Sequence, residues 1–165
     1  MKLFLITGIA TLLFAFSNKG KYPVVKLYAY QQKVSKGANF STSDKKTSPT
    51  IKHHVYIEVR ENENITISRV WLNGKGIAFD TIMANSPVTL EKSVKFGKKT
   101  YYDTLVPETK NNIIQVVLNS SKQIESQKIP SRFKKYQLLI EYKVGYKQYF
   151  LGSISFKELD PEVNQ

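Results

Sequence analysis

Short segments in which apolar and polar residues alternate make up most of this chain. In residues 53–60, for example, Val55, Ile57 and Val59 share one side of an extended strand, because successive side chains of a strand point to opposite faces. Similar segments recur about every 8 to 12 residues between turn-forming residues, and hardly any segment has a helical period. The pattern predicts an all-β fold, an antiparallel two-sheet sandwich of about eight or nine strands.

The expected strands follow one another along the whole chain after its N-terminal segment. Between the first two, the Ser-, Thr- and Lys-rich residues 35–49 include Gly37 and Pro49, which predicts a mobile loop near residues 35–50. The predicted strands are residues 24–33, 53–60, 65–72, 77–83, 88–96, 100–106, 113–119, 136–144 and 147–156.

The segment YQLLIEY, residues 136–142, refines this expectation. It follows Pro130 and resembles the penultimate strand of immunoglobulin and fibronectin type III folds, in which an early Tyr makes a corner hydrogen bond. The resemblance covers a small part of the chain and includes no Cys partner. It implies an immunoglobulin-like sandwich and says nothing about activity.

The segment RVWLNGKGIAFDT, residues 69–81, raises the question of a phosphate-binding loop. A Walker loop needs Lys followed by Ser or Thr at the start of a helix, but Lys75 precedes Gly76 and a β-branched, aromatic run. Asn73-Gly74 between two predicted strands is instead a strong hairpin signal, because both residues tolerate positive φ. We therefore expect a tight turn and no nucleotide site or other cofactor.

The N-terminus has the pattern of a secretory signal. Lys2 is followed by a nearly unbroken apolar run that ends in Ala15-Phe16-Ser17, which is the order of regions that a signal peptidase reads. The run is shorter than the roughly 20 residues of a membrane span, although a retained anchor is the alternative. Residues 1–17 are thus the predicted signal peptide, residues 18–165 a single domain, and no transmembrane segment is expected after cleavage.

The predicted signal places the mature protein outside the cytoplasm, and its composition favours a bacterial envelope protein with an anionic partner. The chain contains no cysteine and has a formal net charge of +12. We expect a protein of the bacterial periplasm or cell surface, where a basic surface attracts acidic glycans and lipids rather than nucleic acid. Another envelope protein is the alternative partner.

Catalytic and metal-binding patterns are weak. The only histidines, His53 and His54, are adjacent on a predicted strand, so they point to opposite faces and do not chelate one metal; one is expected at the core rim and one in solvent. Glu58, Glu61 and Glu63 lie near a turn without the order of a calcium loop. The sequence therefore predicts no catalytic, cofactor or metal residue, and a protein that is not an enzyme.

The best candidate for a contact surface is a basic, aromatic segment together with two tyrosines near the last turn. Tyr offers apolar area with a polar tip, and basic groups attract anions. We therefore expect an exported binding module whose basic, Tyr-bearing face contacts an anionic glycan or lipid. The alternatives are a carboxylate-based enzyme and a structural protein of envelope assembly. The predicted contact residues are Lys128, Arg132, Phe133, Lys134, Lys135, Tyr146 and Tyr149.

Overall fold

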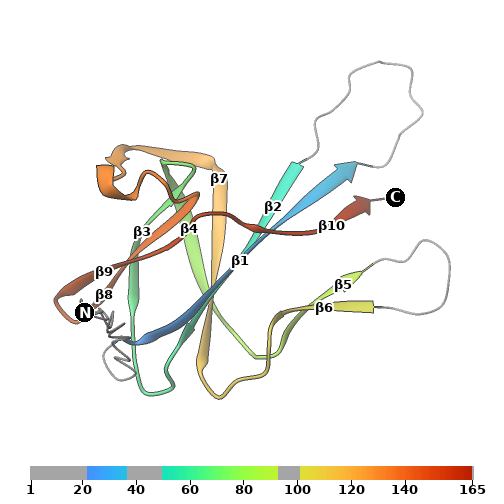
Figure 1. Cartoon of the computed structure of the whole chain (residues 1–165), viewed down its shortest axis with the longest axis horizontal. Coiled ribbons are helices and arrows are strands. Elements are labelled where there is room, and N and C mark those ends of the chain that lie inside the picture. The colour runs from blue at the N-terminus through green and yellow to red at the C-terminus, as the bar shows by residue number, and fades with distance from the viewer. Residues whose placement is uncertain (1–21, 37–49, 93–100, 165) are drawn as a thin grey trace, which may run out of the picture.

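The computed structural model describes residues 22–36, 50–92 and 101–164. These residues form ten strands and one short 3-10 helix, with no α-helix among them, which confirms the all-β prediction (Figure 1). No helix in the described ranges is long and apolar enough to cross a membrane. The predicted signal peptide and most of the predicted loop near residues 35–50 lie outside the described residues.

The elements follow one another in a nearly unbroken series of strands. In chain order they are β1 (Val24–Lys36), β2 (Thr50–Val59), β3 (Thr66–Leu72), β4 (Lys75–Ala84), β5 (Val88–Lys92), β6 (Tyr101–Val106), β7 (Asn112–Lys128), η1 (Ser131–Phe133), β8 (Leu138–Val144), β9 (Lys147–Ser153) and β10 (Lys157–Asn164).

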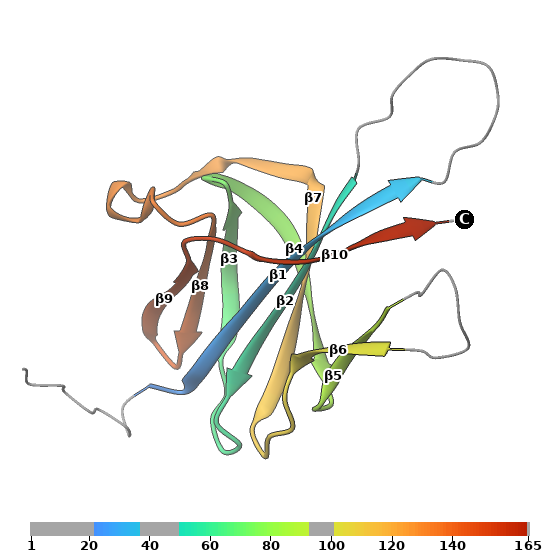
Figure 2. The ribbon, with the colours of Figure 1, turned by 45° about the vertical axis from the view of Figure 1, so that its right-hand side comes forward.

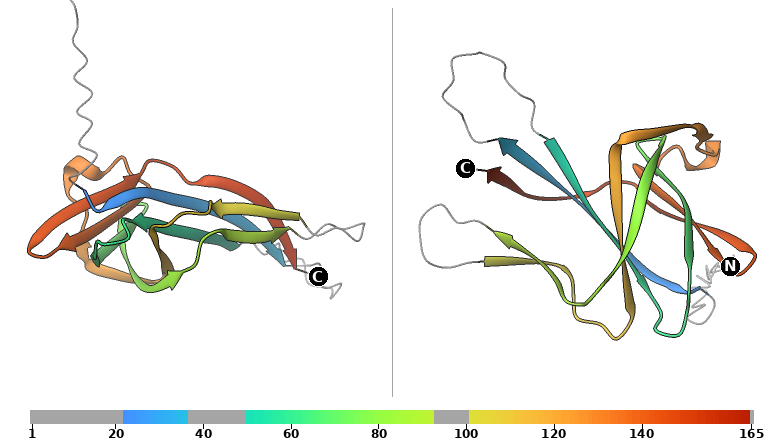
Figure 3. Two further views of the ribbon diagram at one scale, coloured as in Figure 1. Left: turned by 90° about the horizontal axis from the view of Figure 1, so that it is seen from below. Right: turned by 180° about the vertical axis from the view of Figure 1, so that it is seen from behind.

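Eight strands form one large sheet in the order β10-β1-β2-β7-β4-β3-β8-β9, and β5 and β6 form a separate two-stranded ribbon. The strands at the two ends of this order, β9 and β10, are joined by residues 154–156 alone. The sheet therefore has to curl until its edges approach each other, as the views in Figures 2 and 3 show. All of its pairs are antiparallel except β1 with β10, which is parallel.

The hairpin between β3 and β4 has the predicted turn. Asn73 has φ of 51° and Gly74 has φ of 80°, so both central residues are in the left-handed region, as a type I′ turn requires. Lys75 begins β4 directly afterwards. The Gly74-Lys75-Gly76 segment is therefore a strand connection, and no helix follows it to bind a phosphate.

The inner core fills the concave side of the curled sheet. Val55, Ile57 and Val59 of β2 pack there with residues of β3, β7 and β8, which confirms that these three side chains share one face. Phe156, from the connection between β9 and β10, also joins this cluster. The short connection thus helps to close the open side of the curl.

An outer core lies on the opposite face of β1, β2 and β7, under the β5–β6 ribbon. Leu105 and Val106 of the ribbon pack against Tyr28, Tyr30 and Tyr56, among others. This face of β2 carries His54, Tyr56 and Glu58, and all three are buried. Tyr56 packs against the ribbon, whereas His54 lies 3.4 Å from the Gln32 amide oxygen and Glu58 accepts a hydrogen bond from the Tyr28 hydroxyl.

Several strand bounds differ from the prediction. β7 continues to Lys128 instead of stopping at residue 119, and β10 is a strand that the pattern did not predict. Pro161 in β10 has no N–H to donate, which argues against a strand in sequence reasoning. β10 lies at the edge of the sheet, paired with β1 alone, and an edge position tolerates proline.

Candidate functional site

The predicted basic segment lies around η1, at one end of the β8–β9 hairpin. Arg132 holds its guanidinium carbon 4.6 Å from the centre of the Phe133 ring and 5.8 Å from that of Phe150. The two Phe rings are themselves 4.6 Å apart. Arg132 and Phe133 are thus tied to β9, while the exposed side chains of Lys134 and Lys135 follow at the surface.

Lys128 and the two predicted tyrosines are placed differently. Lys128 is the exposed last residue of β7. Tyr146 is fully exposed in the turn between β8 and β9. Tyr149 is half-buried, because its ring stacks on Tyr142 at 5.5 Å and meets Tyr22 edge-on at 6.0 Å.

The structure does not bring these seven residues together on one surface. β8 has seven residues, so at about 3.3 Å per residue it separates its two ends by roughly 20 Å. The basic segment precedes β8, and Tyr146 follows it (Figure 1). The predicted contact residues therefore form two separate patches. The basic segment lies at one end of β8, and Tyr146 lies at the other.

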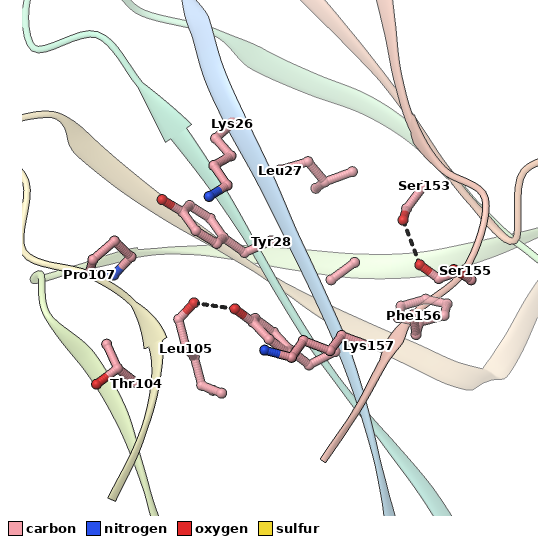
Figure 4. Close-up of a pocket in the computed structure, with 12 residues that line it drawn as sticks. Lys26, Leu27, Tyr28, Thr104, Leu105, Pro107, Ser153, Ser155, Phe156 and Lys157 are labelled. Carbon is pink, nitrogen blue, oxygen red and sulfur yellow. Dashed lines mark hydrogen bonds between the residues drawn. The ribbon is translucent and has the colours of Figure 1, made fainter.

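A different basic, aromatic site lies where β1, β6 and the β9–β10 connection meet. These elements line an open cavity of about 530 Å³. Figure 4 shows Lys26 and Tyr28 of β1, Thr104 and Leu105 of β6, and Lys157 of β10 in its lining. We call this cavity the Lys–Tyr groove.

Two hydrogen-bonded tyrosines form the floor of the Lys–Tyr groove. The Tyr30 hydroxyl donates to the Leu105 carbonyl oxygen at 2.7 Å, and the Tyr28 hydroxyl donates to the Glu58 carboxylate at 2.9 Å. Burial, with help from Glu58, raises the pKa of Tyr28 to about 12, and burial raises the pKa of Tyr30 as well. Both rings are therefore neutral and fixed in position.

Two lysines stand over these rings. The Lys26 ammonium is 4.7 Å from the centre of the Tyr28 ring, and the Lys157 ammonium is 5.8 Å from that of Tyr30. Tyr28 and Tyr30 are alternate residues of β1 and so share a face, and Lys157 is the register partner of Tyr30 on β10. The pairing of β1 with β10 thus places two positive charges on the same side of the sheet.

A smaller cavity of about 180 Å³ adjoins the groove, and it also includes Tyr30 and Lys157. Its lining contains three carboxylates, those of Asp103, Glu158 and Asp160. Glu158 accepts a hydrogen bond from the Gln31 side-chain amide at 2.5 Å. The charged residues that line the larger cavity are therefore all positive, whereas the smaller cavity is lined by both positive and negative residues.

The buried Glu58 carboxylate holds Tyr28, which forms part of the groove floor, in position. It accepts hydrogen bonds from the Tyr28 hydroxyl, the Thr109 hydroxyl at 2.9 Å and the Asn111 amide at 2.7 Å. Burial alone raises its pKa, but these three donors and the nearby Lys26 more than offset it, so that the pKa lies below 4.5. Glu58 is thus an ionised structural group inside the fold.

The remaining candidate metal ligands are dispersed. His53 and His54 do point to opposite faces, but neither is in solvent: His54 is buried 3.4 Å from the Gln32 amide oxygen, and His53 packs on the Phe156 ring at 4.7 Å. Burial lowers the pKa of both. Among the described residues, no three His, Asp or Glu side chains are close enough to hold a metal ion.

Sequence reasoning overlooked Lys26, Tyr28, Tyr30 and Lys157. The period-two spacing of the first three was visible in the sequence, and it could have marked one basic, aromatic strand face. Lys157 could not have been added, because its place depends on β10 and on a parallel pairing with β1.

Comparison with protein-family models, with curated proteins and with solved structures finds no match to this chain. Its function is therefore inferred from its own geometry and charge.

Proposed function

We propose that this chain is an exported, non-catalytic binding module of the bacterial cell envelope, and that it binds an anionic glycan in the Lys–Tyr groove. The observation that carries this proposal is the pair of ammonium groups, Lys26 and Lys157, held over a fixed aromatic floor. Cations placed in this way are available to a ligand while their stems remain ordered by the rings.

Charge and spacing favour a ligand with repeated negative charges. Tyr28 and Tyr30 are two residues apart, so the lysines above them are spaced by roughly 7 Å along the strand. None of the described residues that line the larger cavity is acidic. A net charge of +12 adds a long-range attraction for polyanions.

The groove also offers groups that suit sugars. The hydroxyls of Thr104 and Ser155 lie in its lining and complement the hydroxyl groups of a glycan. Carboxylates or phosphates on such a chain would then pair with the lysines as charge-assisted hydrogen bonds. This combination favours an acidic glycan over a lipid headgroup that presents a single charge.

The proposed fold type is a reduced immunoglobulin-like sandwich. In support of this proposal, the β5–β6 ribbon packs on one face of β1 and β2 and forms a second, smaller layer. In such folds the layers serve as a rigid base and binding residues lie at their margins. The Lys–Tyr groove lies at a margin of this kind, between the ribbon and β10.

Titration with polygalacturonate tests the proposal, with the neutral methyl ester of the same polymer as the ligand control. Replacing Lys26 and Lys157 together by Ser should weaken binding at least about tenfold, since two charged contacts are lost. Replacing Lys134 and Lys135 by Ser removes the same charge from the η1 segment and should have little effect. Binding of the unaltered protein should also weaken as salt is added, because salt screens the charges.

Other results of these titrations would indicate a different site, no site or a different ligand. A larger loss in the Lys134/Lys135 variant would move the site to the predicted basic segment, and equal losses would mean diffuse attraction without a site. Melting temperatures of both variants should stay close to that of the parent, because exposed substitutions usually change stability by less than about 0.5 kcal/mol. Binding to anionic vesicles but not to the polymer would favour a lipid, and binding to neither would overturn the proposal.

A carboxylate-based hydrolase is the second candidate function, because Asp103, Glu158 and Asp160 line the smaller cavity. Glycoside hydrolysis requires two carboxyl groups across the bond that is cleaved. Prolonged incubation with the polymer should release no new reducing ends if the chain is a binding module. Release that disappears on Asp103→Asn would instead establish the enzyme.

A further inference from the structure

The large sheet contains a gap between β2 and β7. The two strands are paired only from Val55 with Val116 to Val59 with Asn112. Beyond Val55, β2 remains paired with β1 as far as Thr50, and β7 beyond Val116 remains paired with β4. In Figure 1 the two strands run apart beyond this point.

Two strand edges therefore face each other across the gap, and no described residue pairs with either of them. In an antiparallel ladder, alternate residues direct their N–H and C=O groups to the same neighbour. Alternate residues of 50–54 thus direct main-chain groups away from β1 and toward β7, and alternate residues of 117–120 direct theirs away from β4 and toward β2. We call these two segments, with the space between them, the strand gap.

The strand gap is a cavity of about 480 Å³ that reaches both faces of the sheet. Ile51 and Leu118 lie on the face of the inner core, because each is an even number of residues from an inner-core residue of its own strand. Val34 and Val117 lie toward the other face, together with the buried ring of His54. A strand added here would find apolar contacts for its side chains on both sides.

Charge indicates what kind of strand would fit. Lys52 is the one charged side chain among the described residues that line the gap. Its ammonium lies 3.9 Å from the Glu162 carboxylate, and both side chains are exposed to solvent, so this pair contributes little to stability. A net charge of +12 opposes the approach of a second copy of this chain.

From these observations, we propose that the strand gap binds an extended, acidic peptide segment of another protein, which adds as a strand between β2 and β7. Its main chain bonds to the two facing edges, as in other cases of strand addition. Its apolar side chains contact Ile51 on one face and Val117 on the other, and its acidic end pairs with Lys52. The site is independent of the Lys–Tyr groove, none of whose lining residues it shares.

A labelled synthetic peptide tests the proposal on the full chain. The probe is a seven-residue peptide of alternating valine and threonine with a glutamate at each end, and its control carries N-methyl groups on alternate amides. The plain peptide should bind saturably and the N-methylated one should not, because methylation removes the donors along one edge and a strand between β2 and β7 needs both edges. Hydrogen exchange should slow at residues 50–54 and 117–120 when the plain peptide binds.

Matched variants locate the site. Ile51→Glu and Val117→Glu each place a negative charge in the gap and should weaken peptide binding about tenfold or more, since an inward charge blocks strand pairing. Ile82→Glu makes the same change at an exposed residue of β4 outside the gap and should bind like the parent. Circular dichroism of all three variants shows that they remain folded.

Four results would overturn the proposal directly, and two more would replace the proposed occupant by another. The first four are no saturable binding of the plain peptide, equal binding of the N-methylated peptide, unchanged hydrogen exchange at the gap, and equal loss in the Ile82→Glu variant. Slow exchange at residues 50–54 before any peptide is added would mean that the chain fills its own gap. A concentration-dependent dimer that Val117→Glu abolishes would mean that a second copy is the occupant. Neither of the last two results depends on the Lys–Tyr groove, so failure here leaves the glycan proposal intact.

Discussion

At the scale of single residues, the backbone of the β3–β4 turn is the clearest link between sequence and structure. Asn73 and Gly74 both have positive φ, and glycine adopts such angles at no steric cost. A Cβ atom added at Gly74 would meet no heavy atom within 4 Å. Any penalty for a larger residue there therefore comes from the backbone alone.

Gly74→Val should lower the free energy of unfolding by roughly 1 kcal/mol or more, because a β-branched residue is strained at positive φ. Urea denaturation measures the change. Lys75→Ala is the control, since Lys75 is exposed and begins a regular strand. Equal stability of the Gly74→Val variant and the parent would contradict the assignment of the turn.

Glu58 shows how a residue can look functional in the sequence and be structural in the fold. Its neighbours Glu61 and Glu63 are exposed in the following turn, but Glu58 is buried and held by three donors. A carboxylate with several hydrogen bonds is stabilised in its charged form. The three glutamates therefore do not act together.

The lowered pKa of Glu58 predicts a pH dependence of stability. The unfolded carboxyl has the ordinary pKa of 4.5 and the folded one a lower value, so the contribution is complete above 4.5 and is lost as the pH falls through the folded pKa. Glu58→Gln should lower stability at neutral pH and flatten the pH dependence in that acidic window. Urea titrations at several pH values measure both effects, and Glu61→Gln, at an exposed position, serves as the control. An unaltered acidic slope in Glu58→Gln would contradict this role.

At the scale of elements, alternation located the strands well but not their ends. β3, β4 and β8 fall close to the predicted ranges, because each has a clear period of two between turn residues. β7 is longer than predicted, since its second half is polar and lacks an apolar alternation. β10 was missed because Asp160 and Pro161 interrupt it, and only its edge position makes them acceptable.

The β5–β6 ribbon buries a face of the large sheet that would otherwise be exposed to solvent. Without it, the Tyr28, Tyr30 and Tyr56 face of the sheet would be in water. Alternation predicts two faces but does not say which of them another element covers. The Lys–Tyr groove also depends on the ribbon, which supplies one of its walls.

At the scale of the whole molecule, the two cores lie on opposite faces of the same strands. β2 contributes Val55 and Ile57 to the inner core and Tyr56 to the outer one. Loss of either core would leave the shared strands with one uncovered apolar face. We therefore expect the described fold to unfold as a single cooperative unit.

Leu105→Ala tests this coupling from the outer core. Leu105 is 2% exposed, and removing such a side chain costs about 2–5 kcal/mol. The single Trp of the chain, Trp71 on β3, is buried elsewhere in the sheet. Its fluorescence transition in urea should shift together with the circular dichroism transition, while Tyr101→Ala at an exposed ribbon position should shift neither. A Trp71 transition that stays in place would mean that the ribbon unfolds separately.

The sequence by itself determined the properties that depend on local order. These are the all-β class, the turn at Asn73-Gly74, the strong basic charge and the opposite orientations of His53 and His54. Each follows from dihedral preferences or from the period of two, which act between residues that are close in the chain.

Only the tertiary structure decided which distant segments meet. The curl of the eight-stranded sheet, the parallel pairing of β10 with β1 and the covering ribbon join residues far apart in sequence. They bring Lys157 to the same groove as Lys26 and separate Tyr146 from Arg132. A sequence pattern gives the face of each side chain but not the strand that lies next to it, because strand order depends on packing over the whole sheet.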